Sequence, residues 1–428
     1  NTGKTLAIKD GLSVKNELIN NGNIIFKSDS NGTGQLDRFT GNIIGNGTIA
    51  VERYIPVETQ DTRAFRFLTS TVNSTQPIYD NWQESGSSPA GFGTHITGNN
   101  NGQNGLDQTI TGNYSMYTFD NSFQGDQSNA WNPVTSTKNT NLIAGKAYRI
   151  FIRGDRNYDL DSSNPVDPPN TNVTLRASGD LVTGDYAVSL NTKAGYYSMI
   201  GNPYQANVNI NNVTGVNMNT NFYYVWDPNR GQRGAYVTVD LPQGTNSGTS
   251  DADEYLQPGQ SFFVQTLNNG SASMTFTESS KALSAAATKV FSTNTEPKIN
   301  LLLYTDDALA NNESEADALG INFSMNGNNA VDQMDGGKLG NPDENLARLN
   351  GGNHLSLENR SMPVDGEMLP LYTSGYSGAD YTFKAKATNL PDNVDAYLYD
   401  GYTGNQSLLL QGDNTFSFTV DANAPGSI

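Results

Sequence analysis

Four oxygen-bearing side chains stand at every second position in the segment RGDRNYDLDSSN, a spacing typical of a loop that wraps a cation. They are Asp155, Asn157, Asp159 and Asp161. Carboxylate and amide oxygens are the ligands that Ca²⁺ takes in proteins, so we predict a calcium site at these residues. The segment departs from an EF-hand because Leu160 stands where glycine is required and no glutamate closes the loop. A solvated acidic turn explains the same composition.

The other carboxylates predict no catalytic pair. With 43 Asp and Glu in the chain, two carboxylates at the separation needed for glycoside hydrolysis can be drawn in many ways. The acids gather in loops rich in glycine and asparagine, however, and do not stand alone among aromatic residues. Two such stretches, 251–254 and 306–317, are further oxygen-rich candidates for a cation or for a solvated loop.

Histidine and cysteine chemistry is sparse. The chain has two histidines, His95 and His354, and no cysteine, which removes thiolate nucleophiles, thiolate metal sites and disulfides. Neither a G-x-S-x-G elbow nor an H-E-x-x-H helix motif is present. We therefore expect both histidines to be structural, and we predict a non-catalytic protein with no cofactor other than calcium.

Charge and hydropathy exclude two classes of partner. The chain carries a formal net charge of −18 with only 25 Lys and Arg, so it repels nucleic acid and anionic lipid. The longest apolar runs, such as 301–304 and 408–410, are far shorter than the roughly 20 residues of a membrane-spanning helix. We expect no nucleic-acid partner and no membrane insertion.

Short β-branched or aromatic runs closed by Gly, Asn, Asp or Pro repeat along the whole chain and predict many short strands. The clearest pair lies in 196–237, where YYSMI is stopped by Gly-Asn-Pro and FYYVW by Asp-Pro-Asn. Proline cannot continue a central ladder, so both turns end a strand. Within this stretch we expect Asp227 to accept from turn amides and Arg230 and Arg233 to hold adjacent loops.

The fold class is therefore predicted to be all-β, in three parts. Residues 1–50 have Asn-Gly corners between very short runs, which indicates either a β-solenoid-like segment or a tight meander. Residues 51–290 read as a large β-rich domain, and VERYIPV alternates Val51, Arg53 and Ile55 against Glu52 and Tyr54. Residues 291–428 contain eight candidate strands and predict a C-terminal β-sandwich of jelly-roll or Ig-like type, with ENLARL (344–349) as a short helix.

Several segments in order resemble a module common in large secreted proteins of Bacteroidetes. They are VERYIP, RAFRFLT, NWQESG, GFGTHITG, YRIFIRGDR, YSMIGNPY and YVWDPNRGQRGAYV, followed by LSLENR, MLPLY and AYLYDGYTG near the C-terminus. The resemblance covers residues 51–428. It implies a cargo of the type IX secretion system, displayed at or released from the cell surface. The C-terminal sorting domain of that family would then follow Ile428.

The resemblance implies an adhesin-type function, since some members are large surface adhesins linked to gliding. It brings no catalytic residues to carry over. The expected partners are the secretion machinery or surface-anchoring proteins, together with glycans or surfaces. The alternative is a carbohydrate-binding domain or, less favoured, a glycoside-hydrolysing domain of a secreted multidomain protein. Four aromatic residues beside turns support that alternative if they are exposed: Trp82, Trp131, Tyr204 and Trp226.

Overall fold

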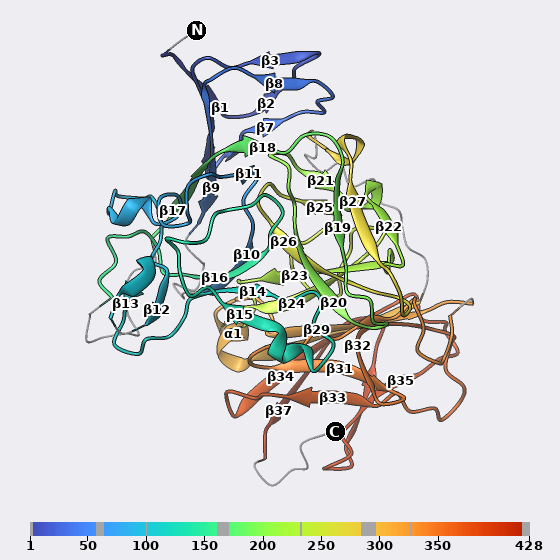
Figure 1. Ribbon diagram of the computed structural model, residues 1–428. Coiled ribbons are helices and arrows are strands. Elements are labelled where there is room, and N and C mark those ends of the chain that lie inside the picture. Colours follow the sequence, from blue (N-terminus) through green and yellow to red (C-terminus); the bar gives the residue numbers. More distant parts are fainter. Residues whose placement is uncertain are drawn as a thin grey trace. The chain divides into compact units, whose positions relative to one another are not determined.

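The structure is a computed structural model that describes residues 3–56, 64–99, 101–160, 171–231, 233–283, 297–325 and 327–421. Strands dominate the described residues, and the single α-helix among them is the one-turn α1 (Asp306–Ala310) (Figure 1). The all-β prediction is confirmed. No helix in this part of the chain has the length and apolarity to cross a membrane.

The chain divides into two compact units. The first contains residues 1–223 and 254–287, and the second contains residues 224–253 and 288–428. The predicted boundary at 290/291 falls close to the passage into the second unit at 287/288. The structure differs from the predicted division for residues 224–253, which group with the C-terminal part of the chain, and for residues 1–50, which group with the first unit.

The first unit opens with stacked parallel strands. The register places Thr5 beside Asn23 and Asn23 beside Thr48, and the two other sides of the coil are also parallel pairs. A meander would pair neighbouring strands antiparallel, so the solenoid-like alternative describes this segment. The strands are β1 (Thr5–Ile8), β4 (Asn23–Phe26) and β9 (Thr48–Ile55); β2 (Gly11–Leu12) with β7 (Gln35–Leu36); and β3 (Glu17–Ile19) with β8 (Asn42–Ile44). A hairpin of β5 (Ser28–Asp29) and β6 (Gly32–Thr33) projects from the second coil.

Aliphatic ladders fill the coils. Ile24 and Ile49 lie in register with Leu6, and Ile24 and Ile49 are 4% and 7% exposed whereas Leu6 is 49% exposed. The corners need glycine, because a Cβ on Gly41 would lie 1.5 Å from the carbonyl oxygen of Asn16 in the preceding coil. The Asn46-Gly47 corner is a second such contact, because a Cβ on Gly47 would lie 2.3 Å from the carbonyl oxygen of Gly22.

The rest of the first unit is built of antiparallel pairs, apart from the parallel pair of β12 and β13, and one apolar core extends from Ile8 in the coils to Leu181. β17 (Val173–Ser178) pairs with β9 and so extends the coil sheet. A four-stranded sheet has the order β10 (Ala64–Leu68), β16 (Tyr148–Ile152), β14 (Met116–Phe119), β15 (Trp131–Pro133). Further pairs are β19 (Tyr186–Ser189) and β22 (Thr214–Val216) on either side of β27 (Ser273–Phe276); β20 (Tyr197–Gly201) with β26 (Ser261–Gln265); β11 (Val72–Asn73) with β18 (Asp180–Leu181); β12 (Thr97–Asn99) with β13 (Asp107–Gln108); and β21 (Val208–Asn209) with β25 (Tyr255–Leu256). Short 3₁₀ turns cover Glu84–Gly86, Gln103–Gly105, Gln127–Ala130, Ile210–Asn212 and Glu278–Ser280.

The second unit is an eight-stranded sheet curled into a half-barrel. Besides this sheet, the second unit contains β24 (Ala235–Asp240), and the boundary between the two units at 223/224 falls inside β23 (Phe222–Asp227). All eight predicted C-terminal strands are present, but the predicted helix over 344–349 is wrong because those residues form a strand between two partners. The sheet order is β33 (Leu371–Ser374), β31 (Asn345–Asn350), β32 (Asn353–Arg360), β29 (Asp317–Phe323), β28 (Lys298–Thr305), β34 (Asp380–Thr388), β37 (Gly412–Thr419), with β30 (Gly336–Gly337) beside β32; β35 (Ala396–Tyr399) and β36 (Gln406–Leu409) form a separate hairpin.

Candidate functional site

The predicted calcium loop follows β16, and Asp155 uses its carboxylate for protein amides. Its Oδ2 accepts from the backbone N–H of Gly91 at 2.7 Å, and its Oδ1 accepts from the N–H of Asn157 at 2.9 Å. Asp155 is buried, whereas Asn157 and Asp159 are exposed, and Asp161 lies outside the described residues. No group of three His, Asp or Glu side chains that could hold a metal ion occurs in the described part of the chain. Calcium at these four residues stays a prediction.

The same loop carries a residue that the sequence did not single out. Arg156 is 6% exposed and forms a forked ion pair with Asp107, with Nη1–Oδ2 and Nη2–Oδ1 distances of 2.8 and 3.0 Å. Nδ1 of His95 lies 3.2 Å from the same Oδ2. We call these three residues the His95 cluster. It joins the loop after β16 to the long excursion that contains β12 and β13.

The His95 cluster has the partners of a structural site. Nε2 of His95 lies 2.9 Å from the carbonyl oxygen of Tyr158, and a carbonyl can only accept, so this nitrogen is a donor and is not available as a base. Burial alone would raise the pKa of Asp107, but hydrogen bonds from His95 and Arg156 outweigh burial and hold the pKa well below its usual range. The Asp107 carboxylate is therefore a fixed anion that anchors Arg156 and lies against His95.

The second histidine lies in the second unit. His354, on β32, stacks on Tyr372 with ring centroids 4.1 Å apart and planes 20° from parallel. Its backbone carbonyl accepts from the N–H of Lys338 at 2.9 Å. The ring is exposed, and its observed contact is aromatic stacking at the sheet surface.

Two acids of the 306–317 stretch turn out to be buried ion-pair partners. Glu315 is fully buried and pairs with Arg230, and it also accepts from the N–H of Thr249 at 2.7 Å. Asp317, which begins β29, lies 2.8 Å from Nζ of Lys338. For these two carboxylates, the predictions of a metal-ion site and of a solvated loop are both wrong, because Arg230 holds Glu315 and Lys338 holds Asp317 inside the unit.

The expectations for the 196–237 turns hold in the structure. Asp227 accepts from the N–H of Asn229 at 3.0 Å and from the hydroxyl of Ser250 at 2.6 Å. Arg233 pairs with Asp343, and both carboxylate oxygens accept from its Nε at 2.8 and 2.9 Å. The turn amide and the two arginines behave as expected, but the corner is not self-satisfied, because the carboxylates that pair with Arg230 and Arg233 are Glu315 and Asp343 and the buried Nε of Arg230 has no hydrogen-bond partner.

Three of the four aromatic residues considered for sugar binding are core residues. Trp82, Tyr204 and Trp226 are 4%, 0% and 8% exposed, so the expectation that they are exposed is wrong. Trp131 is half-buried and packs edge-on against Phe119 with centroids 5.0 Å apart.

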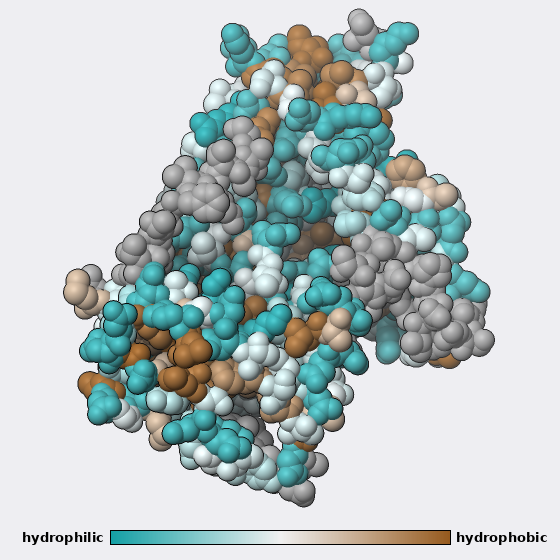
Figure 2. Space-filling view, turned by 180° about the vertical axis from the view of Figure 1, so that it is seen from behind, coloured by the Kyte–Doolittle hydropathy of each residue, from teal (hydrophilic) through white to brown (hydrophobic). Residues whose placement is uncertain are grey.

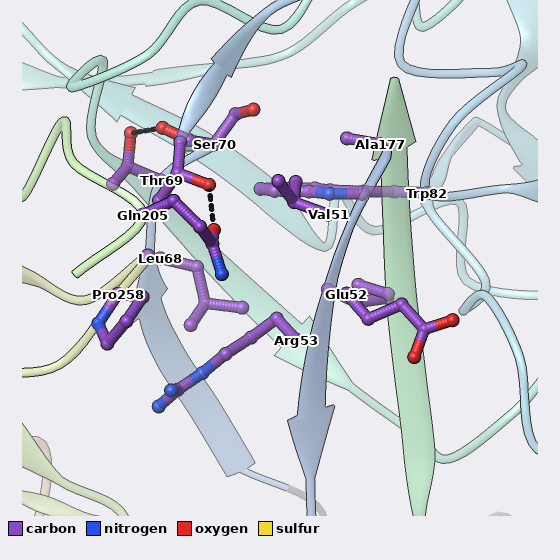
Figure 3. Close-up of a pocket in the computed structure, with 13 residues that line it drawn as sticks. Val51, Glu52, Arg53, Leu68, Thr69, Ser70, Trp82, Ala177, Gln205 and Pro258 are labelled. Carbon is purple, nitrogen blue, oxygen red and sulfur yellow. Dashed lines mark hydrogen bonds between the residues drawn. The ribbon is translucent and has the colours of Figure 1, made fainter. Parts of the chain in front are cut away.

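A small pocket in the first unit is lined by Arg53, whose guanidinium forms no ion pair with any carboxylate in the described part of the chain (Figure 3). Arg53 lies on the face of β9 that points inward, and its Nη2 donates to Oε1 of Gln257 at 2.6 Å. Its Nε is buried and has no hydrogen-bond partner. Figure 3 shows the guanidinium on the side of Leu68 and Pro258, with the carboxylate of Glu52 pointing the opposite way. The sequence showed the alternation that puts Arg53 on the same face as Val51 and Ile55. It did not show that the partner of the guanidinium would be the neutral side chain of Gln257.

Comparisons of the chain with protein-family models, with curated proteins and with solved structures found no match. The resemblance to secreted surface proteins of Bacteroidetes therefore stays a prediction.

Proposed function

We propose that the chain is a non-catalytic extracellular surface module of adhesin type. The observation that carries this proposal is the stack of parallel coils in residues 5–55, in which β4 pairs with β1 on one side and with β9 on the other. A parallel coil is the repeating unit from which extended stalks are built, because each coil needs only its neighbours.

The apolar ladder inside the coils becomes exposed at β1. Leu6 is half-exposed at the top of the ladder that continues through Ile24 and Ile49. Figure 2 shows hydrophobic side chains at the top of the view, where the coils lie, next to hydrophilic ones. An exposed apolar side chain beside the edge of a parallel strand is a place where another molecule can bind, which supports a role in surface contact.

Export and placement follow from the same proposal. The protein is a cargo of the type IX secretion system, located at the cell surface, and its partners are the secretion machinery or surface-anchoring proteins. The supporting features are the sequence resemblance, the net charge of −18 and the absence of cysteine. Adhesion or gliding is the activity in which the module would serve.

A deletion in the producing bacterium tests this function. The region that encodes the module is removed in frame, and attachment to glass and to glycan-coated surfaces is measured together with gliding speed. Protease treatment of whole cells, followed by antibody detection, reports surface exposure in the parent strain. We expect the parent protein to be cleaved on intact cells and the deletion strain to attach or glide less. Normal attachment and gliding of the deletion strain would contradict the proposal.

One observation favours carbohydrate binding as a second candidate function. Tyr397 and Tyr399 point outward from β35 and are 50% and 51% exposed, and Leu408, opposite Tyr397 on β36, is 42% exposed. Two tyrosine faces at alternate positions of a hairpin form a flat platform on which sugar rings can stack. A glycan array tests it, with Tyr397→Ala/Tyr399→Ala as the variant and Tyr402→Ala, in the hairpin turn, as the control. Hits that survive the double substitution would count against this platform.

A further inference from the structure

The methionines of the chain fall into a buried group and an exposed group. In the second unit Met325 is fully exposed, and Met334 and Met368 are 47% and 73% exposed. In the first unit no methionine is more than 6% exposed, and the residues concerned are Met116, Met199, Met218 and Met274. Exposed apolar side chains that gather at one place mark a surface for a partner, so the position of the exposed group matters.

The exposed methionines stand in two loops at one end of the curled sheet of the second unit. The loops are 324–335, of which position 326 lies outside the described residues, and 361–370. They follow β29 and β32, which are parallel neighbours and end in register, so both loops begin at the same edge of the sheet. The hydroxyl of Ser361 donates to Oδ1 of Asn329 at 2.7 Å and joins one loop to the other. We call these two segments the methionine loops.

The methionine loops combine apolar and acidic side chains and contain no lysine or arginine. Val331 and Val364 add apolar surface that is 36% and 73% exposed. Asp332 and Asp365 are exposed beside them in sequence. An apolar surface with charges of one sign around it is complementary to a partner that has an apolar face and charges of the other sign.

Two arginines reach the methionine loops from inside the unit, and both are already paired. Nη1 of Arg348 donates to the carbonyl of Pro370 at 3.0 Å, and Arg348 pairs with Glu358. Arg360 pairs with Glu367. The two arginines are 4% and 1% exposed. Neither is presented to an approaching partner, so the exposed charge of the methionine loops is negative.

We propose that the methionine loops bind a cationic amphipathic segment of a partner protein. Its apolar face lies on the exposed methionines, and its lysines or arginines lie against Asp332 and Asp365. Methionine suits such a surface because its unbranched thioether side chain adapts to partners of different shape. An amphipathic segment provides the apolar face and the cationic rim in one element. This inference does not depend on the proposed surface function.

Three fluorescent probe peptides, added to the whole chain, test the proposal. The cationic amphipathic probe is LKKLLKLLKKLLKL, the anionic probe has glutamate in place of each lysine, and hexalysine has the charge of the first probe without its apolar face. We expect fluorescence anisotropy to show that the cationic amphipathic probe binds at least about tenfold more tightly than either of the others. A cationic amphipathic probe that binds no more tightly than either of them would overturn the proposal.

A triple substitution removes the apolar surface. Met325→Gln/Met334→Gln/Met368→Gln keeps the side chains at nearly the same size, and because all three are exposed the Tm should change little. The affinity for the cationic amphipathic probe should fall at least about tenfold. The matched control has three substitutions at exposed apolar residues of the first unit and should keep the affinity. It is Ile110→Gln/Ile143→Gln/Val216→Gln.

A second variant tests the charges. Asp332→Asn/Asp365→Asn removes two exposed carboxylates, and the amide oxygen at position 332 can still accept from the N–H of Met334, as Oδ1 of Asp332 does at 2.8 Å. The affinity should fall at low salt and depend less steeply on salt concentration. Affinity that survives the triple methionine substitution, or that falls equally in its control, would overturn the proposal. Methionine-dependent binding to phosphatidylcholine vesicles without binding to the cationic amphipathic probe would also overturn it and would assign the surface to lipid.

Discussion

At the scale of single residues, the His95 cluster is the strongest electrostatic feature of the first unit. Asp107 lies against Arg156 and His95, and its side chain is 17% exposed. Asp107→Asn keeps the shape but leaves the guanidinium of Arg156 buried without a counter-charge, which should lower the free energy of unfolding by about 3–5 kcal/mol at neutral pH. Urea unfolding measures this loss. Asp180→Asn, at an exposed aspartate, is the control and should change stability by less than about 0.5 kcal/mol.

The pH dependence of the same residue follows from its depressed pKa. Because the folded-state pKa lies below the unfolded value, the contribution of Asp107 is complete above the unfolded pKa of about 3.9 and is lost as pH falls through the folded-state pKa. The penalty of Asp107→Asn should therefore shrink as the pH is lowered below about 4. A penalty that stays constant down to strongly acidic pH would show that the charge of Asp107 does not stabilise the fold.

For Asp240 we expect the opposite dependence of stability on pH. Burial raises the pKa of this carboxyl, at the end of β24, to about 6, and Lys298 offsets only part of the effect. The folded state thus holds its proton more tightly than the unfolded state, so stability falls as pH rises from about 4 to 6 and stays lower above that range. Asp240→Asn should raise the free energy of unfolding by about 2 kcal/mol at pH 8 and change it little at pH 4. Thermal unfolding of both proteins at the two pH values measures the difference, and an equal effect at both would contradict it.

At the scale of elements, the coils offer a matched pair of isoleucines. Ile24 on β4 is 4% exposed inside the ladder, and Ile19 on β3 is 60% exposed. Ile24→Ala should cost about 2–5 kcal/mol because it opens a cavity between two coils. Ile19→Ala should stay within about 0.5 kcal/mol because its side chain already meets water. Urea unfolding followed by circular dichroism compares the two, and similar costs would contradict the inward and outward assignment of the coil faces.

Strand elements were predictable where alternation and turn residues agree. The Asn46-Gly47 corner marks a contact between coils, and the eight C-terminal runs all form strands. The segment ENLARL was not predictable, because its residues favour a helix and only pairing with β32 on one side and β33 on the other makes it the strand β31. Local propensity decides little when a segment is placed between two strands of a sheet.

The candidate sites were less predictable than the strands. The alternation around Arg53 indicated an inward side chain. No pattern in the sequence reveals that its guanidinium contacts Gln257, which is 204 positions away. Likewise, Arg230 and Glu315 are 85 positions apart, and Asp107 and Arg156 are 49 positions apart. Acidic stretches look alike in sequence whether they end in solvent or in a buried ion pair.

At the scale of the whole molecule, a test can show whether residues 224–253 are an integral part of the second unit. Glu315 is fully buried, and Arg230 and Thr249, both in residues 224–253, are among its partners. A fragment of residues 288–428 alone would leave this carboxylate without its cation, which costs about 3–5 kcal/mol. We expect that fragment to unfold without cooperativity. A second fragment, in which a flexible Gly/Ser linker joins residues 224–253 to residues 288–428, should unfold in one cooperative transition.

Calorimetry and near-ultraviolet circular dichroism distinguish the two fragments. Arg230→Met in the linked fragment is the matched control, because it keeps the segment but removes the cation, and it should lose most of the stability gained by linking. Glu315→Gln together with Arg230→Met should recover part of that loss, since a neutral amide needs no counter-charge. A cooperative transition of residues 288–428 alone, at the same temperature as the linked fragment, would show that residues 224–253 are not an integral part of this unit.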